Sequence, residues 1–501
     1  MSPHILYIAA IRLPTEKAHG LQIMKMCEAL ASTGSQMELV VPGRKTHVVD
    51  DAFSYYKVEQ RFSIHTCKTL DFVQLGRFGF LITTILFALR AAWYAKRCGA
   101  EVLYTRDRIL ALLLALLLPG TPLLFEVHGR EPRWLIRLVA RHAQFVAITG
   151  GVADTLVALG VAPEHVLVAH DAVDLSDFSN PESKAVARTR LGITQNAQVA
   201  MYIGRLDGWK GVGTLLEASK QLESVHVVII GGEEGQVHEL QERYPNVQFL
   251  GYRPYAELAN NQVAADVLVL PNTATDETSV RFTSPLKLFT YMASKRPIVA
   301  SDLPSLREVL DEESAYFVVP DDTSDLARGI MHALTDGEAA QKANQARTNV
   351  ERYTWRSRAE SIVRFLDQTQ AARGIVRPQH RQVVKFAIAG GLSACTNFII
   401  LFVLTDLFHV YYLVSATVAF LAAFAVSFLL QKFWTFEHNT GRTHTQLMLY
   451  FIAAMVNLLI TIGLLYVLTD VLHLWYMFSA LVTAFLIAIG TFFLYRSVIF
   501  I

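Results

Sequence analysis

The chain has 501 residues, too many for one ordinary domain, and its length favours two or three domains. Its 45 basic and 44 acidic residues give a formal net charge of +1. This balance argues against a polyanion-binding surface, and therefore against a nucleic-acid partner. The hydrophobic fraction of 52% is high for a soluble protein, and the excess is not evenly spread along the chain.

The cysteines are far apart in sequence and form no C-x-x-C pair; they are Cys27, Cys67, Cys98 and Cys395. This spacing argues against a disulfide framework or a zinc site and is consistent with a reducing cytoplasm. The N-terminal segment HILYIAAIRLP has no basic region before its apolar run. We therefore interpret it as a first β-strand rather than as a signal peptide.

Residues 4–366 alternate short β-rich runs with helical stretches, a pattern typical of parallel α/β sheets. The strands expected in a first sheet are 4–11, 36–42, 101–105, 122–128, 145–149 and 166–170, and those in a second are 199–205, 226–232, 247–251, 267–272 and 297–301. A polar segment near 172–190 lies between the two sets. We predict two doubly wound domains, 1–172 and 173–366, with ligands bound beyond the carboxyl ends of the strands.

Two long apolar stretches lie in the first predicted domain, at 78–96 and 109–120. The first contains Arg90, and the second has only about ten apolar residues, fewer than the roughly 20 that a membrane span needs. We interpret both as buried helices or as helices docked on the surface. A shallow contact with a membrane is the alternative.

A basic linker, 367–384, precedes runs without Asp, Glu, Lys or Arg at 386–405, 407–431, 443–469 and 471–495. Each run is long enough to cross a bilayer, so we predict an all-α membrane bundle of four transmembrane helices at 385–501. Lys and Arg lie in the linker, in the loop 432–442 and at Arg496, but not in the turns 406–410 and 470–474. The positive-inside rule then places the N-terminal portion and the C-terminus in the cytoplasm.

The membrane portion contains a repeat. VLTDLFHVYYLVSA at 403–416 and VLTDVLHLWYMFSA at 467–480 share eight of fourteen residues at an offset of 64. Each copy forms a helical hairpin with an even number of spans, so the two hairpins run parallel. Such a duplication can frame a path between its halves, or it can serve only as an anchor.

Polar residues inside this bundle are candidates for lipid binding. Asn397 lies within the first predicted helix, and Lys432 and Arg496 lie at equivalent cytoplasmic ends of the second and fourth. These groups could bind a lipid phosphate. The alternatives are hydrogen bonding between helices for Asn397 and interfacial anchoring for the two basic residues.

The stretch YIGRLDGWKGVGTLLEAS at 202–219 has the most informative chemistry of the N-terminal portion. A strand ends at Gly204, a glycine-rich loop follows, and a helix begins near Gly213. Backbone N–H groups and the positive end of a helix favour a phosphate there, and Arg205 and Lys210 add two cations. The loop lacks the G-x-x-x-x-G-K-[ST] pattern of a Walker A motif. Exposed surface cations without a ligand are the alternative interpretation.

The C-terminal portion resembles a known family. The similarity rests on the segments KFAIAGG, NFIILFVL and VSFLLQKFWTF, and on FFLYRSVIF, which is the second copy of the last of these. Through these segments, residues 383–501 are similar to GtrA-like membrane proteins. This resemblance implies the handling of polyprenyl-phosphate-linked sugars in the bacterial inner membrane. Gln431 and Tyr495 stand where such proteins usually have an Asn, a departure that bears on any specific role of this side chain.

The N-terminal portion, about 1–366, resembles glycosyltransferase family 4, which has the GT-B fold. The resemblance rests on FEVHG, GRLDGWKGVGTLLEA, VVIIGGEEG and SPLKLFTYMASKRPIVASD in this order. It implies a nucleotide-diphosphosugar donor and transfer with retention of configuration. By position, it implies catalytic roles for His128, Arg205 and Lys210, and donor-binding roles for Gly20, Gly204, Gly231, Gly232, Arg253, Lys287 and Thr290.

Thr290 is a departure from the family pattern, because a Glu that accepts hydrogen bonds from the ribose is usual at this position. Thr can also accept a hydrogen bond, but more weakly than a carboxylate. No D-x-D motif is present in the relevant loops, so no metal and no other cofactor are expected. The pairs Asp50–Asp51 and Asp321–Asp322 are interpreted as solvated turns.

These features predict a membrane-bound glycosyltransferase that moves a sugar from a nucleotide-diphosphosugar to a polyprenyl phosphate or a lipid-linked saccharide. The membrane domain would bind or flip the lipid-linked sugar, and fusion would raise its local concentration there. One alternative is a non-catalytic lipid-sugar transporter whose transferase-like domain only binds nucleotide sugar. Another is a transferase whose helices serve only as an anchor. The small membrane bundle is also consistent with a homo-oligomer.

Overall fold

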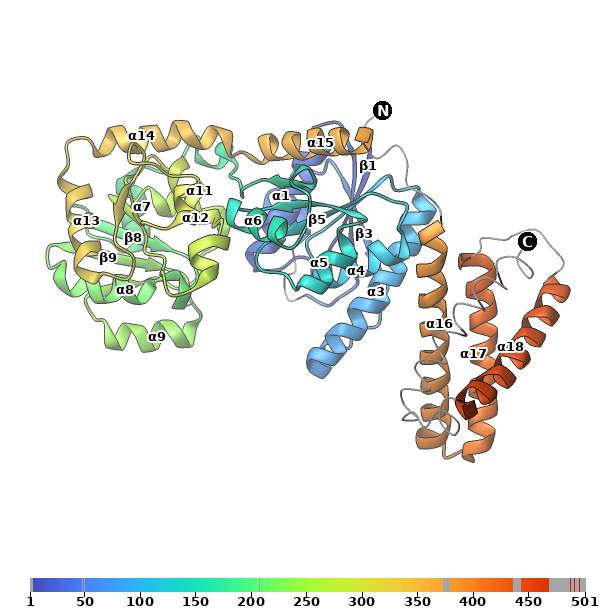
Figure 1. Ribbon diagram of the computed structural model, residues 1–501. Helices are drawn as coiled ribbons and strands as arrows, with labels where there is room; N and C mark the ends of the chain where they lie inside the picture. Colours follow the sequence, from blue (N-terminus) through green and yellow to red (C-terminus); the bar gives the residue numbers. More distant parts are fainter. Residues whose placement is uncertain are drawn as a thin grey trace. The chain divides into compact units, whose positions relative to one another are not determined.

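The computed structural model describes residues 3–46, 48, 50–206, 208–372, 379–435 and 443–467, together with Ile487, Thr491 and Tyr495. The chain divides into two compact units, residues 1–374 and 375–501. The first unit contains two parallel sheets and the second is helical, as the sequence predicts (Figure 1). The two units are described separately below.

The first sheet of the N-terminal unit has seven parallel strands in the order β3-β2-β1-β4-β5-β6-β7. Their bounds are β1 His4–Ile8, β2 Gln36–Pro42, β3 Ser63–Cys67, β4 Val102–Thr105, β5 Leu123–Val127, β6 Ala143–Ala147 and β7 Val166–Val168. The helices between them are α1 Ala18–Ser32, α2 Ala52–Tyr56, α3 Gly76–Cys98, α4 Arg108–Leu117, α5 Arg133–Val139 and α6 Gly150–Ala158. The sequence did not predict β3, because only its last residue is buried and its pattern is not apolar.

The second sheet has six parallel strands in the order β10-β9-β8-β11-β12-β13. Their bounds are β8 Gln198–Ile203, β9 Val225–Ile230, β10 Val247–Phe249, β11 Val267–Leu270, β12 Ile298–Ser301 and β13 Tyr316–Val318. The helices are α7 Lys184–Leu191, α8 Val212–Ala218, α9 Glu234–Arg243, α10 Leu258–Gln262, α11 Leu286–Ala293, α12 Pro304–Arg307, α13 Thr323–Thr335 and α14 Ala339–Asn349. The short edge strand β13 was also missing from the prediction.

The central strands are apolar because helices cover both faces of a parallel sheet. Every residue of β1, β4, β5 and β6 is buried, and the same is true of β11 and β12. Parallel strands present their carboxyl ends at one edge, so the loops that follow them gather there. The chemistry predicted from the sequence lies in these loops.

The last helix of the unit, α15 (Trp355–Ala372), returns from the second sheet to the first domain. Trp355, Ile362 and Leu366 belong to the same hydrophobic core as β1 and α1. Figure 1 shows α15 beside α1. The packing therefore assigns residues from about 355 onward to the first domain, whereas the predicted boundary at 366 placed them in the second. A returning helix cannot be recognised from local patterning, because its amphipathic face fits either core.

The apolar stretches predicted to be buried or docked helices form α3 and α4. By length and composition, α3 is one of three helices in the described residues that could cross a membrane; the others are Ile388–Leu407 and Thr417–Thr435. The second half of α3 packs in the core of the first domain through Phe87, Ala88 and Ala91. Its first half exposes Phe78 and Ile82. The helix is thus part of the α/β fold, with an apolar tip on the surface.

The C-terminal unit contains α16 (Gln379–Phe402), α17 (Tyr412–Leu429) and α18 (Thr443–Tyr466). Wider helical turns follow α16 at η9 (Val403–Leu407) and α17 at η10 (Leu430–Thr435). α16 and α17 pack together as the first predicted hairpin. The third predicted helix corresponds to α18, and most of the fourth lies outside the described residues. The second copy of the repeat lies there too, except for Val467.

Candidate active site

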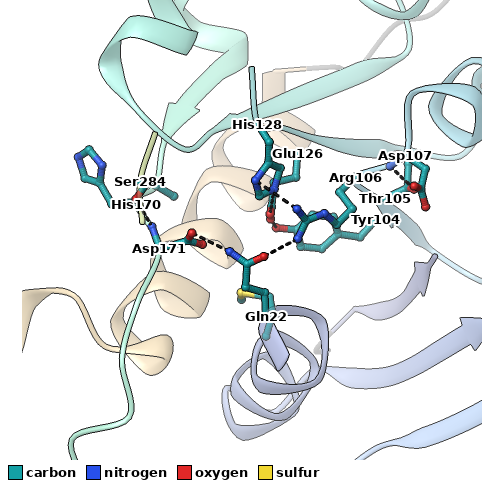
Figure 2. A network of polar contacts seen from close by, with 12 residues as sticks. Gln22, Tyr104, Thr105, Arg106, Asp107, Glu126, His128, His170, Asp171 and Ser284 are labelled. Atoms are coloured by element: carbon teal, nitrogen blue, oxygen red, sulfur yellow. Dashed lines mark hydrogen bonds and ion pairs between the residues drawn. The ribbon is translucent and has the colours of Figure 1, made fainter. Parts of the chain in front are cut away.

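His128 directly follows β5, at the carboxyl edge of the first sheet (Figure 2). Its Nε2 atom lies 2.6 Å from Oε1 of Glu126, and its Nδ1 atom lies 3.3 Å from Nη2 of Arg106. A guanidinium group can only donate, so Nδ1 accepts from Arg106 and the ring proton on Nε2 is donated to Glu126. Burial and the charge of Arg106 lower the pKa of His128 to about 4. The imidazole is therefore neutral at pH 7, with its tautomer fixed.

Glu126 is a buried carboxylate on β5, with 4% of its side chain exposed. Its Oε2 atom lies 3.1 Å from Nη2 of Arg358 on α15 and accepts a hydrogen bond from the hydroxyl of Tyr104. Burial alone would raise the pKa of Glu126, but Arg358 and His128 outweigh this effect and hold its pKa well below the usual range. Glu126 is therefore ionised, and its charge is balanced by the helix that returns to this domain.

A chain of hydrogen bonds leads from this carboxylate toward the second domain (Figure 2). Arg106 donates to Oε1 of Gln22 at 2.8 Å, and Gln22 donates from Nε2 to Oδ2 of Asp171 at 2.6 Å. The backbone N–H of Asp171 then donates to the hydroxyl of Ser284 at 2.9 Å. Ser284 precedes α11 by two residues. Burial raises the pKa of Asp171 to about 6, against the opposing effect of Arg358.

The carboxyl edge of the second sheet is built from closely spaced glycine backbone. The N–H of Gly204 donates to the carbonyl of Ile230 at 2.9 Å, and that of Gly231 donates to the carbonyl of Gly251 at 2.8 Å. A Cβ atom on Gly231 would lie 2.0 Å from the carbonyl oxygen of Gly204, and the φ angle of Gly231 is 127°. The packing of the two loops therefore requires a glycine at position 231, and this edge presents backbone without side chains. A Cβ atom on Gly232 would lie 2.5 Å from Cδ1 of Leu206.

Three cationic side chains surround this edge. Arg205 directly follows Gly204 and is exposed, and Lys210 lies in the same loop with its Nζ atom 3.4 Å from the ring centroid of Trp209. Lys287 comes from α11, with Nζ 3.9 Å from the ring centroid of Tyr202. A Cβ atom on Gly204 would lie 3.3 Å from that same Nζ atom. Cations beside bare backbone at a strand-to-helix loop suit a phosphate or diphosphate.

Family comparisons agree with this arrangement. Residues 20–177 match the model described as Glycosyltransferase Family 4, and residues 197–336 match Glycosyl transferases group 1. Residues 385–500 match the GtrA/DPMS transmembrane domain. The chain is a family 4 glycosyltransferase with a GtrA/DPMS transmembrane domain. Family 4 transfers sugars with retention of configuration, so the expected enzyme class is confirmed.

Individual relatives of this glycosyltransferase were compared by sequence. It is 26% identical over 338 residues to a D-inositol 3-phosphate glycosyltransferase of Saccharomonospora viridis, covering 62% of this chain and 75% of that protein. It is 28% identical over 240 residues to the protein of the same description from Streptomyces bingchenggensis, covering 44% and 51%. The chain thus spans about half the length of that second relative.

Solved structures show the same fold. Sucrose-phosphate synthase from Thermosynechococcus elongatus superposes with a TM-score of 0.61 at 18% identity, covering 74% of this chain and all of that one. The Anabaena protein HepE in complex with UDP-glucose gives a TM-score of 0.57 at 18% identity, covering 73% of this chain and all of that one. At these identities the likeness concerns the GT-B fold of the transferase unit.

Thr290 of the transferase unit is placed differently from the other predicted donor-binding residues. Only 1% of its surface is exposed, and its hydroxyl donates to the carbonyl of Lys287 at 3.0 Å. The same hydroxyl accepts from Nε2 of Gln262 on α10, also at 3.0 Å. Its hydrogen bonds are therefore made inside the fold, between α10 and α11. A role in donor binding stays a prediction for this residue.

Gly20 and Arg253 lie in loop regions of the two domains. A Cβ atom on Gly20, in the first turn of α1, would lie 2.2 Å from the hydroxyl oxygen of Tyr56, so packing alone requires a glycine there. Arg253 is exposed in the loop after β10. Its neighbour Tyr252 forms a hydrogen bond with Tyr55 of the first domain. The donor-binding roles of Gly20 and Arg253 stay predictions.

A pocket of about 370 Å³ lies between α6 of the first domain and the second domain. Both N–H groups at the start of α6, those of Gly150 and Gly151, donate to the carboxylate of Glu308, at 2.7 and 3.3 Å. His170 also borders the pocket, with Nε2 3.6 Å from Glu308. Glu308 thus connects the domains by capping a helix of the opposite one.

The predicted lipid-binding residues belong to the membrane unit. Asn397 is partly buried on α16, and Lys432 is 2% exposed on η10. Arg496 lies outside the described residues. The related residue Asn457 donates to the hydroxyl of Thr491 at 2.8 Å, which is an interhelical bond of the kind considered as the alternative for Asn397.

The described residues include a cluster of side chains that could hold a metal ion. The one such group of three is His4, Glu38 and Cys98, whose ligand atoms lie within 4.8 Å of one another. His4 begins β1, so this group is at the sheet edge opposite to the candidate site. Asp51 and Asp322 cap the starts of α2 and α13. The two Asp pairs that the sequence analysis interprets as solvated turns therefore include helix caps. The absence of a metal from the reaction stays a prediction.

Sequence reasoning missed the polar network around His128, which includes Gln22, Arg106, Glu126, Asp171 and Arg358. Glu126 gave a usable signal, because it is the one charged residue in the buried strand LLFEV. Its counter-ion gave none: Arg358 is more than 200 residues away in an ordinary amphipathic helix. Only the return of α15 to the first domain brings the two together.

Proposed function

We propose that this glycosyltransferase moves a sugar from a nucleotide-diphosphosugar to a lipid acceptor, a polyprenyl phosphate or a lipid-linked saccharide. The observation that carries the proposal is the glycine-lined edge formed by Gly204 and Gly231 beside the Lys287 ammonium, in a chain that also contains a GtrA/DPMS transmembrane domain. UDP-glucose binding by HepE, which shares the fold, supports a nucleotide sugar as the donor.

The donor diphosphate would lie against the backbone of Gly204 and Gly231, with Arg205, Lys210 and Lys287 offsetting its charge as the bond to the sugar breaks. Its leaving group is the nucleoside diphosphate, which departs with the bonding electron pair. The acceptor oxygen bonds to the same anomeric carbon, and the proton of a hydroxyl acceptor passes to the departing diphosphate, whereas an ionised phosphate acceptor has no proton to lose. Neutral His128 can orient the sugar when a sugar hydroxyl replaces Arg106 or Glu126 as the hydrogen-bond partner of its ring. With a pKa of about 4, it is a poor general base.

The membrane domain would bind or flip the lipid-linked sugar, because the fusion keeps the lipid near the transferase unit. Its basic linker and loop favour a location in the bacterial inner membrane, with the transferase unit and C-terminus in the cytoplasm. The GtrA/DPMS domain and its apolar helices establish the membrane association on which this part of the proposal is built.

One observation favours the non-catalytic alternative, a lipid-sugar transporter whose transferase unit only binds nucleotide sugar. Thr290 stands where a Glu is usual in the family, and its hydroxyl makes its hydrogen bonds inside the fold. The two functions differ in turnover, so one experiment separates them.

The test is glycosyl transfer by the purified full chain in detergent. Undecaprenyl phosphate is incubated with a panel of UDP-, GDP- and dTDP-sugars, and glycolipid is detected by mass spectrometry. Lys210→Ala should abolish the product, whereas Lys220→Ala, an exposed lysine paired with Glu217, should leave it unchanged. Nucleotide-sugar binding without any product would contradict transfer to this acceptor and support the transporter. A product that is unaffected by Lys210→Ala would contradict the assigned diphosphate site.

A further inference from the structure

Aromatic side chains form a layer across one end of the membrane unit. The ring of Tyr450 on α18 lies 5.5 Å from that of Phe428 on α17 and 4.7 Å from that of Tyr495. Tyr495 in turn lies 6.0 Å from Phe386 on α16. These four rings belong to one hydrophobic cluster. The layer therefore connects α16, α17 and α18 with Tyr495.

Five polar side chains are buried on the same side of this layer. The set consists of Lys385, Gln431, Lys432, Thr435 and Gln446, of which none is more than 7% exposed. In sequence, each lies on the side of a layer residue that leads toward the start of α16, the end of η10 or the start of α18. We call this set the polar cup.

Hydrogen bonds link the helical elements that carry the polar cup. Lys385 donates from Nζ to the carbonyl of Trp434 at 2.9 Å, which places its ammonium against η10. The hydroxyls of Ser427 and Tyr450 lie 2.7 Å apart. Gln431 lies four residues after Ser427, and Gln446 lies four residues before Tyr450. Each interval is about 6 Å along a helix, and the two lead toward the end of η10 and the start of α18.

Three atoms of the polar cup are buried without a hydrogen-bond partner among the described residues: Oε1 of Gln431, Oγ1 of Thr435 and Oε1 of Gln446. Buried polar groups are nearly always hydrogen-bonded, so these three atoms are available to a further hydrogen-bond partner. A hydroxyl can donate to an anion, and an amide can do so through its NH₂ group after rotation by 180°. All three side chains can therefore bind phosphate oxygens.

Two members of the polar cup are cationic. Lys385 and Lys432 contribute two cations, whereas the acidic residue in the described part of this unit, Asp406, lies at the opposite end of α16. Charged residues within membrane-spanning segments are costly and mark functional sites. Leu429, Phe433 and Met448 are exposed beside the cup, so an apolar chain attached to a bound phosphate could continue along the lipid-facing surface.

We propose that the polar cup binds the phosphate group of a prenyl phosphate lipid, with Lys385 and Lys432 as its charged ligands. The choice of a lipid as the source of this phosphate rests on the proposed function. Gln431, Thr435 and Gln446 supply the neutral hydrogen bonds, and the aromatic layer forms the floor of the site. Of the two lysines, Lys432 was a candidate from the sequence, and Lys385 is the new charged ligand.

The experiment measures ligand binding by the purified full chain in detergent, through thermal stabilisation and titration. Its three ligands are farnesyl phosphate, farnesol and inorganic phosphate. We expect stabilisation by farnesyl phosphate alone. Lys385→Gln and Lys432→Gln should each raise its Kd about tenfold or more, the loss typical of a charge-assisted hydrogen bond. Lys220→Gln, in the transferase unit, serves as the matched control.

Thr435→Val keeps the shape of the side chain and should weaken binding severalfold even if a lysine variant fails to fold. Equal stabilisation by farnesol would overturn the phosphate site, and equal stabilisation by inorganic phosphate would show a site for free phosphate instead of lipid. An unchanged Kd in folded lysine variants would refute the proposed ligands. Binding of farnesyl phosphate without any glycosyl transfer would contradict the proposed acceptor and leave the polar cup supported.

Discussion

Oε2 of Glu126 lies 3.1 Å from Nη2 of Arg358, and both side chains are 4% exposed. The carboxylate belongs to β5 of the first sheet, and the guanidinium belongs to the helix that returns from the second domain. Arg358 also donates to the carbonyls of His170 and Ala169. Arg358 therefore anchors α15, balances the charge beneath His128 and holds the start of the segment that leads to the second domain.

Arg358→Met should destabilise the transferase unit strongly, because it leaves Glu126 buried without its counter-ion. Removing one partner of a buried ion pair costs about 3–5 kcal/mol of the free energy of unfolding. Glu126→Gln should have a similar effect, and the double variant should lose less than the sum of the two. The measurement is the unfolding of the full chain in detergent. The exposed pair Arg328–Asp325 provides the control, since Arg328→Met should cost under about 1 kcal/mol. Comparable losses at both pairs would contradict this account.

Asp171→Asn should change how stability depends on pH. Because the pKa of Asp171 is raised to about 6, its protonated form favours the folded state, and this contribution is complete below the unfolded-state value near 3.8. It is lost as the pH rises through 6. The stability of the variant relative to the native chain should therefore increase between about pH 4 and pH 6, by up to about 3 kcal/mol, and then level off.

The check for Asp171 is the melting temperature of the two proteins from pH 4 to pH 8. Asp50→Asn, at an exposed position, controls for the loss of one acidic group. A difference that does not vary with pH would show that Asp171 is ionised throughout, and would contradict the raised pKa.

Gly231→Ala should abolish nucleotide-sugar binding or weaken it by more than about tenfold, since the new methyl group would overlap the carbonyl of Gly204 and the backbone has a φ angle of 127°. The binding constant for UDP-glucose or another active donor is the quantity to measure. Gly235→Ala, a few residues later on α9 with open space around it, should bind donor normally. Normal binding by Gly231→Ala would separate this edge from the donor site.

Thr290→Val tests whether this residue binds the donor or only supports the fold. The structure predicts a loss of about 1–3 kcal/mol of stability, because Gln262 loses its hydrogen-bond partner in a buried place. The KM for the nucleotide sugar should stay unchanged. Thr335→Val, at an exposed position of the same domain, should have almost no effect on either quantity. An increased KM at normal stability would restore the donor-binding role.

Much of the fold was predictable from local patterns. The buried strands of both sheets are continuous apolar runs, because parallel sheets are covered on both faces, and such runs are visible in the sequence. The edge strands β3 and β13 were missed because they are short or half exposed. The hairpin of α16 and α17 was predicted because a membrane span must be long and uncharged, which is a strong signal.

The candidate site was only partly predictable. Loops after strands gather at one edge, so Gly204, Gly231 and Lys287 could be expected near one another. Thr290 lies one helical turn after Lys287, yet its hydroxyl donates to the Lys287 carbonyl and accepts from Gln262 of α10, and sequence patterning does not reveal this partner from another helix. In the membrane unit, Lys385 gave no specific signal, since it is one of several basic residues that precede the first uncharged run.

The sequence by itself determined the class of the protein: two parallel α/β domains, an apolar helical unit, and ordered motifs that identify a family 4 glycosyltransferase. These properties depend on residue type and spacing along the chain, which are local. The tertiary structure alone decided that Arg358 balances Glu126, that Gln22 connects Arg106 to Asp171, and that Lys385 joins Lys432 in a polar cup. Contacts between residues far apart in the sequence depend on how the helices return and pack, and no local pattern specifies this.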